Sequence, residues 1–219
     1  LFPSEFTEGK KNMLINGLVW MGEELFMKTQ IEEKLAQGFS CIKLKIGAID
    51  FEKELGLLRF IRQNFDAKTI EIRVDANGAF DVNNALDKLI QLNEFELHSI
   101  EQPIKTNQIL EMKLLCQKSP FPIALDEELI GVFGIENKKE LLAKIQPQYI
   151  ILKPSLIGGF KGTLEWISIA KSLHIGWWIT SALESNIGLN AITQFAFTLQ
   201  NPMPQGLGTG GLYTNNCDC

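Results

Sequence analysis

Histidine and cysteine are scarce in this chain of 219 residues, which has two of the first and four of the second. The two histidines, His98 and His174, are too few for a His-rich metal site and argue against most His-dependent catalytic triads. The cysteines match no zinc-binding spacing and are too sparse for a disulfide framework. We therefore expect reduced thiols and a cytoplasmic protein.

Long apolar runs and basic clusters are also missing. No stretch approaches ~18 consecutive apolar residues, the length that would indicate a membrane-spanning helix. The chain has 21 basic against 26 acidic residues and a net charge of -5, without a concentrated basic segment. Nucleic-acid binding needs such a segment. We therefore expect neither a membrane nor a nucleic-acid partner, and the oligomeric state stays open.

Short β-rich apolar runs alternate with longer amphipathic stretches along the whole chain. Asp50 can N-cap the helix that follows it, and Asp81 can cap a helix that ends at Leu92. Repeating units of roughly 25–30 residues predict parallel strands joined by helices. Strands are expected at residues 13–20, 40–46, 70–75, 97–101, 122–126, 149–153 and 176–180, with a short eighth at 203–207.

This alternation predicts the α/β class and a TIM-type barrel. The rival is a doubly wound open sheet, but the glycine-rich dinucleotide turn that would favour it is missing after the early strands. Little chain follows the eighth strand, which favours a (β/α)7β barrel without a full eighth helix. No internal linker is visible, so we expect residues 1–219 to form a single domain. The first residue is not methionine, and we expect a piece of a longer chain.

Five middle strands end on a charged residue. These residues are Lys45, Asp75, Glu101, Asp126 and Lys153. In a parallel barrel the carboxyl ends of the strands form the face that carries the active site. Salt-bridged loop residues would explain any one of them, but five in the same register favour a functional site.

Three carboxylates at one point repel each other, since two unit charges ~4 Å apart cost about 4 kcal/mol at an effective dielectric near 20. A divalent cation removes that repulsion, and oxygen-only ligands suit Mg²⁺ first and Mn²⁺ second. A carboxylate substrate bound to the metal would have an acidified α-proton. Lys45 and Lys153 then flank the substrate, and one can take the proton while the other stabilises charge. Alternation along the strands puts Lys43 on the side of Lys45, and Arg73 and Asn77 on the side of Asp75.

These residues resemble the barrel motifs of a known family. Residues 43–45 (KLK), 73–77 (RVDAN), 100–103 (IEQP), 125–127 (LDE) and 152–154 (LKP) resemble those of the enolase superfamily, muconate lactonising subgroup. Residues 15–20, 181–189, 206–210 and 214–216 resemble more narrowly the o-succinylbenzoate synthases of menaquinone biosynthesis. The resemblance covers nearly the whole chain.

The resemblance implies a Mg²⁺-dependent lyase. Asp75, Glu101 and Asp126 would bind the metal, with Glu127 as the alternative to Asp126. Lys45 would be the acid/base residue, and Lys153 the opposing cation over an enediolate. The reaction would be syn elimination of water from 2-succinyl-6-hydroxy-2,4-cyclohexadiene-1-carboxylate, giving 2-succinylbenzoate. Substrate-binding positions would be Lys43, Arg73, Asn77, Ser181 and Gly208.

The resemblance also implies an N-terminal α+β capping domain, and nothing in this chain corresponds to it. Three alternatives to the dehydration stay open. The first, in the same fold, is racemisation or epimerisation of an N-acylamino acid or a dipeptide. The second is a non-catalytic barrel whose charged residues form an ion-pair network. The third is a phosphate-binding barrel isomerase.

Overall fold

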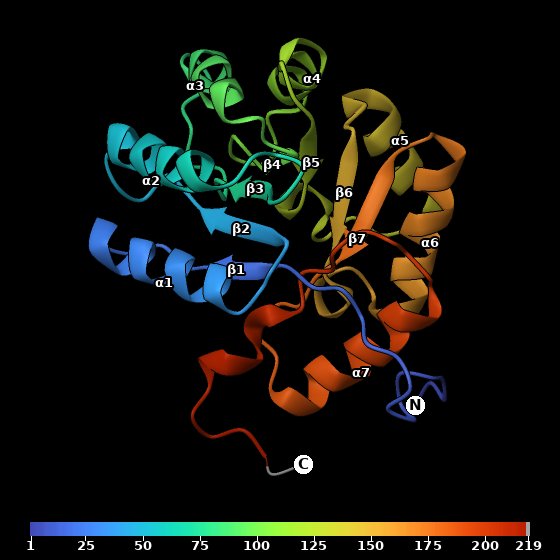
Figure 1. Cartoon of the computed structure of the whole chain (residues 1–219). Coiled ribbons are helices and arrows are strands. Elements are labelled where there is room, and N and C mark those ends of the chain that lie inside the picture. The colour runs from blue at the N-terminus through green and yellow to red at the C-terminus, as the bar shows by residue number, and fades with distance from the viewer. Residues whose placement is uncertain (218–219) are drawn as a thin grey trace.

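A computed structural model describes residues 1–217 of the protein. Its centre is a parallel sheet of seven strands in the order β1-β2-β3-β4-β5-β6-β7. The strands are β1 (Gly17–Val19), β2 (Cys41–Lys45), β3 (Glu71–Asp75), β4 (Ser99–Glu101), β5 (Ile123–Leu125), β6 (Tyr149–Leu152) and β7 (Gly176–Ile179). The helices are α1 (Glu24–Ala36), α2 (Phe51–Asn64), α3 (Ala85–Leu92), α4 (Ile109–Lys118), α5 (Ile135–Ile145), α6 (Gly159–Ser172) and α7 (Asn186–Thr198). They lie around the outside of the curled sheet (Figure 1).

The predicted α/β class and the alternation of strands and helices are confirmed. The sheet curls so far that its two edges approach the same short segment, residues 205–206. Ile15 forms an isolated parallel bridge with Gln205, and Thr180 forms one with Gly206. The eighth strand expected at residues 203–207 is therefore reduced to these two bridging residues between β7 and β1. The architecture is TIM-barrel-like.

Helix starts follow local hydrogen bonding. Helix α2 begins where predicted, because the Asp50 side chain accepts a hydrogen bond from the backbone N–H of Glu52. The predicted start of α3 is wrong. Asp81 accepts from the backbone N–H of Asn83 in a turn, and the helix begins only at Ala85. None of the helices within residues 1–217 has the length and apolar character needed to cross a membrane.

Apolar side chains pack on both sides of the sheet. One large cluster fills the space between the strands and the surrounding helices. A small second cluster, formed by Ala124, Ile151 and Trp178, lies inside the curl. Lys45 pairs in register with Asp75, and Asp75 pairs with Glu101. The carboxyl ends of these strands therefore meet at one edge, as the sequence predicted.

Candidate active site

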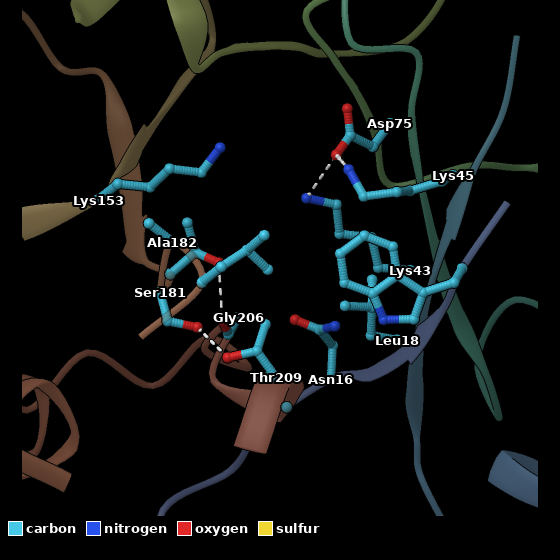
Figure 2. Close-up of a pocket in the computed structure, with 14 residues that line it drawn as sticks. Asn16, Leu18, Lys43, Lys45, Asp75, Lys153, Ser181, Ala182, Gly206 and Thr209 are labelled. Atoms are coloured by element: carbon cyan, nitrogen blue, oxygen red, sulfur yellow. Dashed lines mark hydrogen bonds and ion pairs between the residues drawn. The ribbon is translucent and has the colours of Figure 1, made fainter. Parts of the chain in front are cut away.

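A cavity of about 240 Å³ opens at the carboxyl edge of the sheet (Figure 2). Asn16, Leu18 and Trp20 line it at every second position, because alternate residues of a strand point to the same face. The remaining lining residues come from the ends of β2, β3, β6 and β7, from the bridging segment at residues 205–206 and from the residues that follow it. They are Lys43, Lys45, Asp75, Lys153, Thr180, Ser181, Ala182, Leu183, Gly206, Gly208 and Thr209.

The three carboxylates named from the sequence are nearly fully buried beside this cavity. Asp75, Glu101 and Asp126 are 1%, 2% and 1% exposed. The Nζ atom of Lys43 lies 3.0 Å from Asp75 Oδ2 and also pairs with Glu101. Burial of such charges is tolerated only when each has a partner.

Lys45 and Lys153 complete the pairing. Lys45 Nζ lies 2.9 Å from Asp75 Oδ2 and 5.4 Å from the centre of the Trp20 ring. Lys153 Nζ pairs with Asp126. Figure 2 shows Lys153 reaching into the cavity from one side, with Lys43 and Lys45 on the other. The two lysines proposed from the sequence to flank a substrate therefore do lie on different walls of one cavity.

Burial and charge act in opposite directions on these groups. Burial raises the pKa of the Asp75 carboxyl, but the ammonium groups of Lys43 and Lys45 outweigh it and hold that pKa below its usual range. Burial lowers the pKa of the Lys43 ammonium, but Asp75 and Glu101 outweigh it and raise that pKa. The pKa of Lys153 is raised as well, because Asp126 and Glu101 outweigh burial.

Glu101 differs from the other carboxyls. Burial and the neighbouring Asp75 raise its pKa well above the usual range. Its Oε1 atom is buried and has no hydrogen-bond partner among the described residues. This carboxyl therefore has less compensating positive charge and fewer donors than its burial demands.

Three carboxylates with oxygen-only donors, one of them carrying an orphaned oxygen, fit a hard divalent cation. Within residues 1–217, no group of three or more His, Cys, Asp or Glu side chains is already arranged as metal ligands. Lys43 bridges Asp75 and Glu101, so an ammonium group supplies the positive charge between them. The donor set fits Mg²⁺.

Asn77 connects the base candidate Lys45 to Glu127. Its Oδ1 accepts a hydrogen bond from Lys45 Nζ at 2.7 Å, and its Nδ2 donates to Glu127 Oε1 at 2.9 Å. An amide placed between an ammonium and a carboxylate can adopt only this orientation. Asn77 does not line the cavity. It positions Lys45, and substrate contact by Asn77 stays a prediction.

Gln102 holds the end of β5 in place. The side chain is fully buried, and its Oε1 accepts from the backbone N–H groups of Asp126 and Glu128 at 3.2 and 3.3 Å. Its Nε2 donates to the carbonyl oxygen of Ile104 and to Glu128 Oε2. Gln102 therefore fixes the backbone that carries Asp126.

Arg73 lies deeper in the barrel than the cavity. Its guanidinium lies 4.2 Å from the centre of the Trp178 ring, and it bonds Glu71 and the carbonyl oxygen of Pro204. It is not among the residues that line the cavity. Substrate binding by Arg73 stays a prediction, and the contacts assign it to the polar interior below the site.

Ser181 and Gly208 do line the cavity, and so do the polar residues Asn16 and Thr209, which sequence reasoning missed. Ser181 Oγ lies 2.6 Å from Thr209 Oγ1. Thr209 could not have been found, because it lies in a glycine-rich segment where no alternating pattern indicates which way a side chain points. Asn16 could have been found, because it shares an alternating face with Leu18 and Trp20, and an amide on such an apolar face indicates a polar contact.

A parallel curled sheet with buried carboxylates and lysines at its carboxyl edge defines a barrel of the enolase type. The chain belongs to the enolase C-terminal domain-like family, which it matches over residues 27–215. This confirms the superfamily predicted from the strand-end motifs.

Two curated relatives and one solved structure make the similarity specific. The chain is 60% identical to the o-succinylbenzoate synthase of Desulfotalea psychrophila over 98% of this chain and 58% of that protein. It is 33% identical to the N-succinylamino acid racemase of Thermus thermophilus over 72% of this chain and 40% of that protein. The crystal structure of MenC from Desulfotalea psychrophila superposes with a TM-score of 0.92 at 57% identity, covering all of this chain and 60% of that one. The chain thus spans about three fifths of the first relative.

Proposed function

We propose that this chain is the barrel domain of an o-succinylbenzoate synthase, a lyase of menaquinone biosynthesis. The observation that carries the proposal is the placement of Lys45 and Lys153 on different walls of one cavity, with buried carboxylates beside them. The substrate is 2-succinyl-6-hydroxy-2,4-cyclohexadiene-1-carboxylate, and the product is 2-succinylbenzoate. The 60% identity to the Desulfotalea synthase supports this reaction over the others of the family.

Lys45 is the acid/base residue in this proposal. Its side chain is 13% exposed, so the ammonium reaches the cavity while Asp75 and Asn77 fix its position. Acting as the neutral amine, Lys45 takes the α-proton of the substrate and becomes an ammonium, and it then gives that proton to the departing hydroxide, which leaves as water. Lys153 lies across the cavity, where its ammonium balances the negative charge that develops on the substrate. Lys43, Ser181 and Gly208 contact the substrate from the remaining walls.

Asp75, Glu101 and Asp126 would hold Mg²⁺, or Mn²⁺ in its place, and Glu127 is the alternative third ligand. The bound metal would polarise the substrate carboxylate and so acidify its α-proton. The lysines that now pair with the carboxylates would then be free to face the substrate.

The proposal includes a larger protein. Residues 1–219 would form one (β/α)7β domain of a cytoplasmic enzyme, with an N-terminal α+β domain that closes over the cavity. Support comes from the coverage, because 42% of the Desulfotalea synthase lies outside the match (100% less 58%).

A conservative variant tests the catalytic role of Lys45. Lys45→Arg keeps the charge, but a guanidinium stays protonated at any accessible pH and cannot act as a base. We expect a loss of at least ~10²-fold in kcat, with Mg²⁺ affinity retained. Turnover is measured as 2-succinylbenzoate formed by the chain fused to the unmatched part of the Desulfotalea synthase. If Lys45→Arg keeps more than about a tenth of the wild-type kcat, Lys45 is not the base.

A second candidate function is racemisation of an N-acylamino acid or epimerisation of a dipeptide. The observation that favours it is the pair of lysines on different walls, together with the similarity to the Thermus racemase. Racemisation needs proton transfer by both lysines, whereas dehydration needs it from one. Lys153→Arg should therefore keep much of a dehydration activity and abolish racemisation of N-succinylamino acids.

A further inference from the structure

The side chain of Asn16 is buried and incompletely bonded. Asn16 is 2% exposed, and its Oδ1 has no hydrogen-bond partner among the described residues. Figure 2 shows its carboxamide turned into the cavity. An unpaired polar group at a buried position destabilises the fold, so its presence indicates a partner supplied from outside the chain. A terminal amide can turn over, so it offers either N–H donors or a carbonyl oxygen at this place.

A pair of hydroxyl groups lies beside this amide. Ser181 and Thr209 are both 5% exposed, and their side-chain oxygens lie 2.6 Å apart. Two hydroxyls carry two protons, and only one is used in the bond between them. The other proton is available to an acceptor in the cavity.

The segment that carries Thr209 lies directly against the strand that carries Asn16. A Cβ atom on Gly208 would come within 3.2 Å of the backbone oxygen of Asn16. The absence of a side chain at Gly208 therefore lets the hydroxyl pair and the amide share one end of the cavity. Figure 2 shows this end away from Lys153 and below Lys43.

With the Asn16 carboxamide turned over, so that Nδ2 takes the place of the unpaired Oδ1, all three groups at this end donate hydrogen bonds and carry no charge. They complement acceptor oxygens of a ligand, and they leave the ammonium groups to the end with the carboxylates. A site built from buried donors rejects a ligand that lacks the matching acceptors, because the donors are then left unpaired.

We propose that Asn16, with the Ser181–Thr209 hydroxyl pair, determines substrate specificity by binding the acceptor oxygens of the succinyl arm. This inference rests on the proposed function, since it places the ring carboxylate at the opposite, lysine-bearing end of the cavity. An oxygen of the arm then accepts a hydrogen bond from Nδ2 of the turned-over Asn16 carboxamide, which gives the buried amide a partner.

The test compares two ligands that differ only in the arm. 2-Succinylbenzoate carries a ketone and a carboxylate on a four-carbon arm, and 2-butylbenzoate carries the same four carbons without oxygen. Calorimetry with saturating Mg²⁺ gives Kd for both ligands with the wild-type chain and with Asn16→Leu, a variant of nearly equal size, each fused to the unmatched part of the Desulfotalea synthase. We expect Asn16→Leu to weaken 2-succinylbenzoate by roughly 10- to 100-fold and to leave 2-butylbenzoate within about twofold. Asn190→Leu, at an exposed position of α7, is the control and should change neither Kd.

Equal weakening of both ligands by Asn16→Leu, or no weakening, would overturn the inference while leaving the proposed function standing. Should Asn16→Leu fail to fold, Asn16→Ala and Thr209→Val apply the same comparison, and Thr209→Val should again weaken only 2-succinylbenzoate. If the wild-type fusion binds neither ligand, the proposed function itself is wrong, and the inference is overturned with it.

Discussion

Lys43 pairs with two buried carboxyl groups at once. It is 7% exposed, lies 3.0 Å from Asp75 Oδ2 and pairs with Glu101. Lys45 has a different environment, because it bonds Asn77 and lies over Trp20 at the cavity wall. Two lysines only two residues apart therefore have different environments, and the proposed function gives them different roles, with Lys43 supporting the carboxylates and Lys45 transferring the proton.

We expect Lys43→Met to destabilise the metal-free chain by about 3–5 kcal/mol, since it leaves buried charges without their partner. Mg²⁺ should restore part of this loss, because a cation bound by Asp75 and Glu101 replaces the missing ammonium. At a Mg²⁺ concentration 100 times Kd, binding alone adds about 2.7 kcal/mol. Urea unfolding with and without Mg²⁺ measures both effects.

Lys138→Met is the matched control. Lys138 is also buried, and its Nζ lies 2.9 Å from Glu165 Oε2. This pair joins helices α5 and α6 outside the sheet and includes none of the candidate metal ligands. Lys138→Met should be destabilised by the same amount relative to wild type with and without Mg²⁺, because its metal-binding carboxylates are intact and Mg²⁺ stabilises both chains equally. If Lys43→Met also shows no recovery, the carboxylates do not bind the metal.

The helices and strands could be predicted from the sequence where a pattern of a few neighbouring residues determines them. The apolar runs ending in Lys45, Asp75 and Glu101 are strands β2, β3 and β4, because alternation and β-propensity act within a few residues. The cap at Asp50 was predictable for the same reason.

Other features depend on packing that no local pattern contains. The pairing of each lysine with a particular carboxylate follows from the curl of the sheet, which decides how close the strand ends come. The two bridging residues of the expected eighth strand, Gln205 and Gly206, lie in place because β7 and β1 meet them from both sides. The sequence motif around Gln102 gives no sign of its role. Its hydrogen bonds to the backbone at the end of β5 form only because folding brings the two strand ends together.

Helix α2 is joined to the end of β2 by a buried carboxyl. Glu54 is 2% exposed, and its Oε1 accepts a hydrogen bond from the backbone N–H of Gly47 at 2.6 Å. Its Oε2 is buried and has no hydrogen-bond partner among the described residues. Burial raises the pKa of Glu54, although the backbone N–H groups of the loop act in the opposite direction.

A raised pKa in the folded state makes the ionised form of Glu54 unfavourable for folding. Its contribution to stability is fully present below the unfolded pKa, near 4.5, and is lost as pH rises through the folded pKa. Glu54→Gln keeps the acceptor for Gly47 and cannot ionise. We therefore expect the free energy of unfolding of Glu54→Gln, relative to wild type, to increase between about pH 4.5 and pH 7.

Urea unfolding across that pH range checks this expectation. Glu52→Gln changes an exposed carboxyl in the same helical turn and is the control, which should show no such trend. A difference between Glu54→Gln and wild type that stays constant with pH would contradict the assignment.

At the scale of the whole molecule, the carboxyl face of the barrel exposes apolar side chains beside the cavity. Large apolar side chains are exposed in the segments that follow several strands. They include Met21, Leu25 and Phe26 after β1, Ile130 and Phe133 after β5, and Leu183 and Ile187 after β7. Exposed apolar groups gathered on one face are typical of interaction surfaces. This agrees with the proposed N-terminal domain over the cavity.

On the β7 side, closure of the sheet needs a glycine at position 206. Gly206 bridges Thr180, its N–H donates to the carbonyl oxygen of Ile179 at 2.8 Å, and its carbonyl oxygen accepts from Ser181. A Cβ atom on Gly206 would overlap the side chain of Thr180. The bridging segment can therefore approach β7 only without a side chain at this position.

We expect Gly206→Ala to destabilise the chain by about 1–3 kcal/mol, because the added methyl group forces the bridging segment away from β7. The same displacement moves Gly208 and Thr209, so affinity for 2-succinylbenzoate should fall as well. Gly56→Ala is the matched control, because Gly56 lies inside α2 with no atom near its added Cβ. That variant should gain about 0.5–1 kcal/mol from helix propensity and leave ligand affinity unchanged. Thermal and urea unfolding measure the expected loss of stability in Gly206→Ala and the expected gain in Gly56→Ala. A Gly206→Ala chain as stable as wild type would show that the sheet stays closed without this close approach.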